Sequence, residues 1–140
     1  PRRCLHCGKE QWRNPVPVAV VLMPVDEGVL TVRRVIAPGA GKLALPGGFV
    51  DWGESWQEAA VREMKEETGL IVDADELSLL RIVTVGGVML MFCQTQPRRW
   101  CDLDLVLDPA EVGEAVKVDQ ACELAFPTHS EVLAEFFRNR

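Results

Sequence analysis

Three glutamates in the middle of the chain are spaced as a metal-binding set. Glu63, Glu66 and Glu67 stand at positions i, i+3 and i+4, so a helix would project all three carboxylates from one face. A bare acidic pattern of this kind is often only a solvated helix face, although like charges there repel each other. Here Glu54 adds a fourth carboxylate upstream. Clustered oxygen ligands suit Mg²⁺, which can polarise a phosphoryl oxygen and generate hydroxide from bound water.

The element that must carry these carboxylates is a helix over residues 56–68. Ser55 and Glu58 fit a capping box at its start, and Gly69 stands where a helix usually ends. Ala59 lies on the acidic face and leaves room for a ligand. A different face is suited to packing on a sheet, and it consists of Gln57, Ala60, Val61, Met64 and Thr68.

Short apolar runs bounded by glycine and proline predict the strands around this helix. Residues 16–23 and 29–35 are expected to form a hairpin. Further strands are expected at residues 43–45, 70–72, 77–85, 88–93, 103–107 and 115–118, with a closing helix at 130–138. Strands mixed with two helices indicate an α/β sandwich.

The segment from Gly48 to Leu70 resembles the Nudix box, G-x5-E-x7-R-E-U-x-E-E-x-G-U, in which U is a bulky aliphatic residue. The chain supplies every specified position, namely Gly48, Glu54, Arg62, Glu63, Met64, Glu66, Glu67, Gly69 and Leu70. The resemblance extends from about Asn14 to the C-terminus. It implies an α/β/α Nudix sandwich with a mixed β-sheet over residues 16–140, and a metal-assisted attack of water on a diphosphate.

The same resemblance implies a role for each box residue. Glu63, Glu66 and Glu67 would bind Mg²⁺ or Mn²⁺, with the carbonyl of Gly48 as a further ligand. Arg62 would hold the glutamates in place by ion pairing.

Two supporting roles complete this catalytic set. Glu54 would brace the junction between loop and helix, or join a network behind the metal ligands. The general base in this family is a box glutamate or an acid on a later loop, and Glu111 and Glu114 are the candidates here. Each of these two residues also fits a solvated loop carboxylate.

Three residues outside the acidic set are candidates for substrate binding. Arg33 and Arg34 alternate across a strand, so only one can face the site and bind a phosphate through its guanidinium fork. Either arginine also fits an ordinary surface position. Trp52 lies inside the box loop and could stack on a base, although most tryptophans of this kind simply belong to the core.

Residues 1–15 read as an N-terminal extension with a CxxC formed by Cys4 and Cys7. This stretch resembles the second half of a zinc ribbon found in a Nudix subgroup that acts on ADP-ribose or flavin adenine dinucleotide. The matching residues are Cys4, Cys7, Gly8, Trp12, Asn14 and Pro15. The first CxxC is missing, so only two of the four ligands of a structural Zn²⁺ are present. The SQPWPFPxS signature of NADH pyrophosphatases is also absent, which disfavours NADH as substrate.

The composition excludes several classes of protein. The 140 residues are 48% hydrophobic and 26% charged, which fits one soluble domain. A net charge of −6 argues against general nucleic-acid binding. No apolar run could cross a membrane, and no apolar signal-peptide core opens the chain. The odd count of five cysteines favours a reducing compartment, so we expect a cytoplasmic protein.

These observations predict a pyrophosphohydrolase for a nucleoside diphosphate linked to another group, such as ADP-ribose or FAD. The small-molecule nucleotide would be its main partner, and the resemblance also allows a homodimer. The box alone does not separate this enzyme from a nucleoside triphosphate pyrophosphohydrolase. A non-catalytic nucleotide-sensing module is a third reading, although such modules often lose box glutamates and this chain keeps them all.

Overall fold

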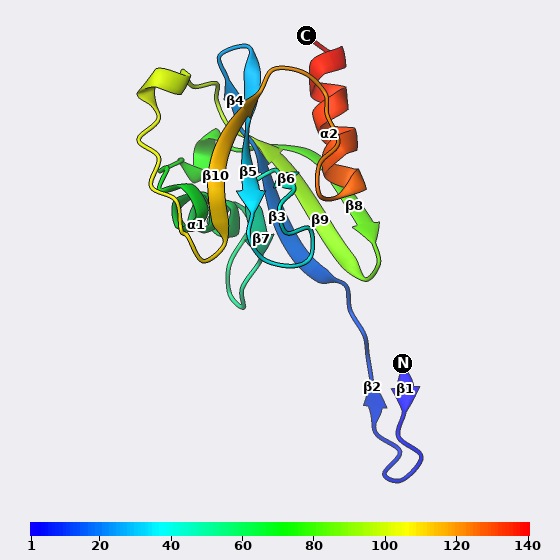
Figure 1. Ribbon diagram of the computed structural model, residues 1–140. Helices are drawn as coiled ribbons and strands as arrows, with labels where there is room; N and C mark the ends of the chain where they lie inside the picture. The colour runs from blue at the N-terminus through cyan, green and yellow to red at the C-terminus, as the bar shows by residue number, and fades with distance from the viewer.

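A four-stranded mixed sheet forms the centre of the computed structural model, which describes all of residues 1–140 (Figure 1). Its strands run in the order β7 (Gly47–Phe49), β3 (Val16–Leu22), β9 (Val88–Gln94) and β8 (Ser78–Val85). The β3 and β9 strands are parallel, whereas the other two pairs are antiparallel. The predicted mixed sheet is therefore confirmed.

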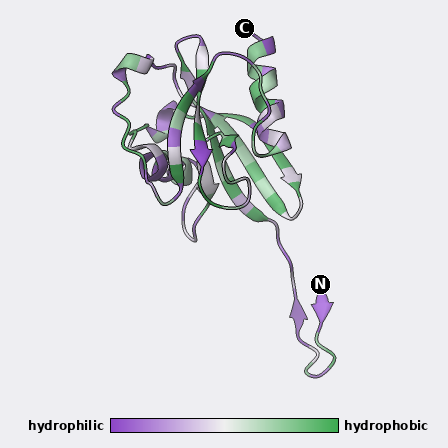
Figure 2. Ribbon diagram, in the orientation of Figure 1, coloured by the Kyte–Doolittle hydropathy of each residue, from purple (hydrophilic) through white to green (hydrophobic).

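The two long helices lie on opposite faces of this sheet. Side chains of β3 alternate between them, so that Val21 packs with Met64 of α1 (Trp56–Thr68). Its neighbour Val20 packs with Leu133 of α2 (Pro127–Arg138). Figure 2 shows hydrophobic segments along the central strands. This arrangement confirms the predicted α/β/α sandwich.

A second, smaller sheet carries the arginines and the late acidic residues. It consists of β10 (Val112–Val118), β5 (Gly28–Arg34) and β4 (Pro24–Val25), with β6 (Leu43–Ala44) beside β5. Two short 3₁₀ turns, η1 (Ala74–Glu76) and η2 (Trp100–Asp102), lie in the connections. The register of β5 and β10 sets Arg33 opposite Glu114.

The expected hairpin between residues 16–23 and 29–35 is wrong. The β3 strand pairs with β7 and β9, whereas β5 belongs to the other sheet and pairs there with β4, β6 and β10. The physical reason is burial: Ala19 to Leu22 are at most 1% exposed, which requires strand partners on both edges as well as helices on both faces.

Two further expected strands are absent. Residues 70–72 and 103–107 form no strand, although Leu70, Val72, Leu103 and Leu105 pack on the α1 side of the core. The backbone of the second segment binds the end of α1 instead, because the Val106 N–H donates to the Thr68 carbonyl at 2.8 Å.

The N-terminal segment stands apart from the sandwich. Strands β1 (Arg2–Arg3) and β2 (Glu10–Gln11) pair only with each other, and residues 1–16 are all exposed. Figure 1 shows this hairpin extending away from the domain on a single strand of chain. Neither α1 nor α2 has the length and apolar character that a membrane-spanning helix needs.

Candidate active site

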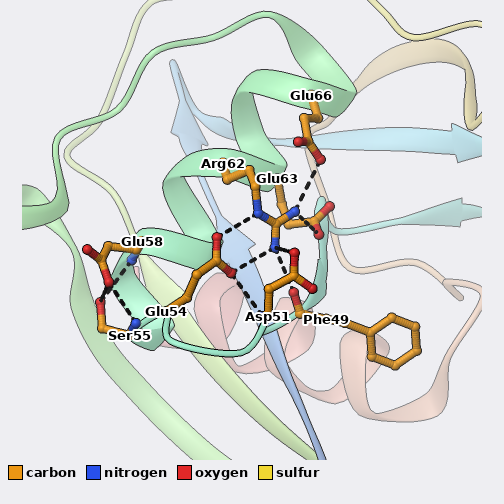
Figure 3. Close-up of polar contacts among 8 residues, drawn as sticks. All are labelled: Phe49, Asp51, Glu54, Ser55, Glu58, Arg62, Glu63 and Glu66. Atoms are coloured by element: carbon orange, nitrogen blue, oxygen red, sulfur yellow. Dashed lines mark hydrogen bonds and ion pairs between the residues drawn. The ribbon is translucent and has the colours of Figure 1, made fainter.

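The acidic residues are positioned by α1, whose ends form as the sequence predicts. The Ser55 hydroxyl accepts the Glu58 N–H at 3.2 Å, and the Glu58 carboxylate accepts the Ser55 N–H at 2.7 Å (Figure 3). Gly69 ends the helix with φ of 75°, a left-handed conformation that glycine adopts at little cost. The predicted capping box is therefore confirmed.

Arg62 forms the centre of a carboxylate network on this helix (Figure 3). Its Nε and Nη2 atoms donate to the two oxygens of Glu54 at 2.8 and 3.0 Å. Its Nη1 donates to Glu63 at 2.7 Å and to Glu66 at 3.1 Å. The same side chain also donates to the Phe49 carbonyl at 2.8 Å, which ties the helix to the end of β7.

These contacts keep both Glu54 and Arg62 charged. The Arg62 guanidinium lowers the pKa of Glu54 to about 2, so that Glu54 stays ionised as an anchor. Hydrogen bonding to Glu54 in turn raises the pKa of Arg62 above its ordinary value. The pair is therefore a fixed support, with no proton to exchange near neutral pH.

Glu63 and Glu67 lie in a different environment, because both are buried. Glu67 is 4% exposed and accepts the Gly47 N–H at 3.1 Å. Burial raises its pKa to about 8, and burial also raises the pKa of Glu63. Gly48 has no side chain for a steric reason: a Cβ there would overlap the Glu63 carboxylate.

This donor set fits a hard divalent cation. Buried carboxylates that repel each other gain most from a cation, and Gly48 places its backbone directly against Glu63. No three His, Cys, Asp or Glu side chains converge into a ready-made metal cage. Mg²⁺ does not require one, because it commonly takes one or two carboxylates and completes its shell with water and substrate phosphates.

The two later acids lie in different surroundings. Glu114 is paired with Arg33 at 2.9 Å, and Arg33 also donates to the Gly41 carbonyl at 3.0 Å. Glu111 is exposed, and its charge helps to raise the pKa values of Glu63 and Glu67. Of the two candidates for the base, Glu111 is therefore the one whose charge acts on the buried glutamates, and Glu114 is paired with an arginine.

Arg34 lies on the opposite side of β5 from Arg33, as strand alternation requires. Its Nε donates to the Pro38 carbonyl at 2.8 Å, and its guanidinium lies 5.3 Å from the centre of the Phe126 ring. Its positive charge lowers the pKa of Glu67 in opposition to burial. Arg34 is thus the arginine whose charge reaches the acidic site.

The aromatic candidate, Trp52, lies at the surface. Trp52 is fully exposed in the loop before α1, and the Phe49 ring, 61% exposed, points outward from β7 (Figure 3). An exposed tryptophan beside the acidic helix is available for stacking and is not a core residue.

A groove lies beside this site. It has a volume of about 870 Å³ and runs between α1 and residues 71–74. Arg62 and Glu66 line it together with Lys65 and Arg98, but the buried glutamates do not. The groove therefore borders the acidic site and does not contain it.

The cysteine pair lies in the N-terminal hairpin. The Cys4 N–H donates to the Lys9 carbonyl at 2.8 Å, and the Gly8 N–H donates to the Cys4 carbonyl at 2.9 Å. Hydrogen bonds from Cys7 and His6 lower the pKa of Cys4. Both thiols are exposed, and no third His or Cys ligand joins them. Zn²⁺ at this pair would need ligands from elsewhere.

Sequence reasoning missed two backbone contributions to the site. The Gly47 N–H binds Glu67, and the Phe49 carbonyl binds Arg62. Asp51 was missed too, with its carboxylate 4.0 Å from Arg62. The Pro46-Gly47-Gly48 sequence signals a special backbone there, but it does not indicate which groups the backbone binds.

The family model described as NUDIX domain matches residues 13–138. The chain belongs to the NUDIX family. The residues that match the family model include the whole sandwich and leave out the exposed N-terminal hairpin.

This NUDIX chain is similar in sequence to several curated proteins over part of its length. An ADP-ribose pyrophosphatase of Methanocaldococcus jannaschii is 56% identical over 60 residues, which are 43% of this chain and 36% of that protein. The chain likewise spans less than two thirds of other curated relatives. A MutT-like protein of Streptomyces ambofaciens is 33% identical over 84 residues, covering 60% of this chain and 53% of that protein.

A solved structure supports the NUDIX fold. The NUDIX domain of Shewanella oneidensis NrtR, complexed with ADP ribose, superposes with a TM-score of 0.70 at 21% identity. The match covers 92% of this chain and 90% of that one.

Proposed function

We propose that this NUDIX protein is a metal-dependent pyrophosphohydrolase that cleaves a nucleoside diphosphate linked to another group, with ADP-ribose as the first candidate substrate. The observation that carries the chemistry is the pair of buried carboxylates, Glu63 and Glu67, set against the Gly47–Gly48 backbone. The substrate class is supported by the 56% identical stretch of an ADP-ribose pyrophosphatase.

The metal site would consist of Glu63, Glu66 and Glu67 with the carbonyl of Gly48. A bound Mg²⁺ or Mn²⁺ supplies Lewis acidity toward a phosphoryl oxygen and makes water a stronger nucleophile. Gly47 holds one oxygen of Glu67 through its N–H, which fixes how that carboxylate faces the site. Arg62 fixes Glu63 and Glu66 in the same way and is itself anchored by Glu54.

The reaction adds water across the diphosphate. The water oxygen forms a bond to one phosphorus, and the bond from that phosphorus to the bridging oxygen breaks. The water proton passes to a base, for which Glu111 is the better placed of the two loop candidates, because Glu114 is paired with Arg33. For ADP-ribose the products are AMP and ribose 5-phosphate.

Substrate binding would use the groups that border the acidic site. Arg34 has the position to neutralise a substrate phosphate, since its charge already acts on Glu67. Trp52 offers an exposed ring for a base. We propose a cytoplasmic location, because the odd count of five cysteines favours a reducing compartment.

A hydrolysis panel tests this proposal. Protein with Mg²⁺, and separately with Mn²⁺, is incubated with ADP-ribose, FAD, NADH and nucleoside triphosphates, with Glu67→Gln as control. Mononucleotide products from ADP-ribose or FAD, absent in the control, support the proposal. Turnover of triphosphates alone would replace the proposed substrate class with nucleoside triphosphates.

A further inference from the structure

His129 is a buried polar residue on α2, a helix that carries none of the residues described for the site. The side chain is 5% exposed and lies against the rings of Phe92 and Phe126, with ring centres 5.4 and 4.9 Å away. Its Nδ1 accepts the Leu45 N–H at 3.3 Å. The two phenylalanine rings would pack equally well against an apolar ring of similar size, so only the Leu45 N–H needs the imidazole.

Leu45 lies in the short connection between two strands. It lies between β6 and β7, so its N–H has no partner in a strand ladder and depends on His129. The next carbonyl, that of Pro46, accepts the Val21 N–H at 2.8 Å. The next N–H, that of Gly47, donates to Glu67 at 3.1 Å. Three consecutive residues are thus each fixed by one hydrogen bond, and the last bond holds a buried carboxylate.

The Gly47 backbone has little room to adjust. Its φ is 147°, and a Cβ there would overlap the Ala19 carbonyl of β3. Gly47 and Gly48 also lie opposite Val20 and Ala19 in the β3–β7 ladder, so the bond from Leu45 to His129 fixes the chain directly before this paired segment. Glu67 and Glu63 both contact this pair of glycines.

We propose that His129 is a positioning residue for the metal site: by accepting the Leu45 N–H, it sets the Gly47 N–H and the Gly48 carbonyl where the buried glutamates meet them. The helix α2 acts through this one bond on a site that it does not touch. The positive charge of Arg34 disfavours a proton on the imidazole, so His129 stays neutral and its Nδ1 stays free to accept the Leu45 N–H. The inference rests on the proposed function for its effect on turnover, but its effect on metal binding stands separately.

A pair of substitutions separates the acceptor from the ring. His129→Phe keeps an aromatic ring and removes the acceptor, whereas His129→Asn keeps an acceptor oxygen near the position of Nδ1. Leu133→Ala is the matched control, because Leu133 is fully buried on the same helix and its loss lowers stability through packing alone. Mn²⁺ affinity without substrate, thermal midpoint, kcat and KM are measured for each protein.

The proposal expects His129→Phe to bind Mn²⁺ about tenfold more weakly and to lose kcat with little change in KM, as other groups that orient metal ligands do. His129→Asn should recover most of the Mn²⁺ affinity, and Leu133→Ala should keep it despite a lower midpoint. Wild-type affinity in folded His129→Phe overturns the proposal. So does an affinity in His129→Asn or Leu133→Ala as weak as in His129→Phe.

If His129→Phe does not fold, amide hydrogen exchange of the wild type provides the test. The proposal expects Mn²⁺ to slow exchange at Leu45 as well as at Gly47, and slowing at Gly47 alone overturns it. A wild type that hydrolyses no nucleotide but shows the expected Mn²⁺ pattern would reject the proposed function and leave this inference standing.

Discussion

Arg62 binds both carboxylate oxygens of Glu54 through two different nitrogens, Nε at 2.8 Å and Nη2 at 3.0 Å. This fork joins the loop before α1 to the middle of the helix, and it leaves Nη1 free to hold Glu63 and Glu66. One guanidinium thus fixes the relative positions of three carboxylates that would otherwise repel each other.

Replacing Arg62 by Lys should impair turnover far more than folding. An ammonium has no fork, so it cannot hold Glu54 and the two box glutamates at once. We expect kcat to fall about 10- to 100-fold, with the thermal midpoint lowered by only a few degrees. Steady-state kinetics of Arg62→Lys, Glu54→Gln and the double variant check this. Losses that simply add would contradict a shared network.

Glu67→Gln should lower turnover and raise the thermal stability of the metal-free protein. Glutamine keeps an oxygen for the Gly47 N–H and removes a buried carboxyl group whose ionisation is opposed by burial and by the charges of Glu63 and Glu111. The midpoint of the metal-free protein should rise by about 3 °C, as ~1 kcal/mol produces in a domain of this size. Turnover should fall by more than about 100-fold, because even outer partners of a metal are worth about 10- to 100-fold.

Glu66→Gln is the control for these two opposite effects of Glu67→Gln. Glu66 is exposed, so its neutralisation should lower turnover without raising the midpoint of the metal-free protein. An equal rise in both variants would show that burial of Glu67 is not the cause.

The two neighbouring arginines should differ in their effect on substrate. Arg34→Gln should raise KM about tenfold, the loss expected when one charge-assisted contact to a phosphate is removed. Arg33→Gln should change KM by less than about twofold on the same reasoning, because Arg33 is engaged by Glu114 and Gly41. Kinetics with ADP-ribose decide between them, and a larger effect at Arg33 would mean that the other face of β5 meets the substrate.

Stability should fall in mild acid because of His129. Burial, assisted by the charge of Arg34, lowers its pKa to about 3 in the folded protein, against about 6.5 in the unfolded chain. Below pH 6.5 the unfolded chain therefore binds a proton that the folded protein does not. This contribution costs about 1.4 kcal/mol per pH unit down to about pH 3.

Urea unfolding at pH 7 and pH 5 measures this effect. The wild type should lose about 2 kcal/mol more than His129→Asn between these two values, which is the contribution of one titrating histidine over 1.5 pH units. Equal losses in both proteins would mean that His129 does not titrate as its surroundings indicate.

Features set by neighbouring residues could be predicted from the sequence. The limits of α1 follow from Ser55, Glu58 and Gly69, whose effects on a helix end act within one turn. Strand alternation likewise indicated that only one of Arg33 and Arg34 faces the site.

Features that depend on distant pairing could not. The β3 strand takes β9 as its parallel partner from the other half of the chain, and no local pattern of Val16–Leu22 distinguishes this from a hairpin with β5. Residues 103–107 look like a strand but satisfy the end of α1. His129 acts only through a tertiary hydrogen bond, so its residue type gave no signal, and Pro46-Gly47-Gly48 signalled a special backbone without indicating that Gly47 binds Glu67.

Metal-dependent cleavage of ADP-ribose tests most directly whether the buried glutamates form a catalytic metal site. Chelator-treated protein is titrated with Mg²⁺, and the products are separated by chromatography, with Glu67→Gln run in parallel. We predict no turnover without metal, saturable formation of AMP and ribose 5-phosphate as Mg²⁺ is added, and almost none in the variant. Cleavage that is equal with and without metal, or equal in wild type and variant, would contradict the assignment of the buried glutamates as the metal site.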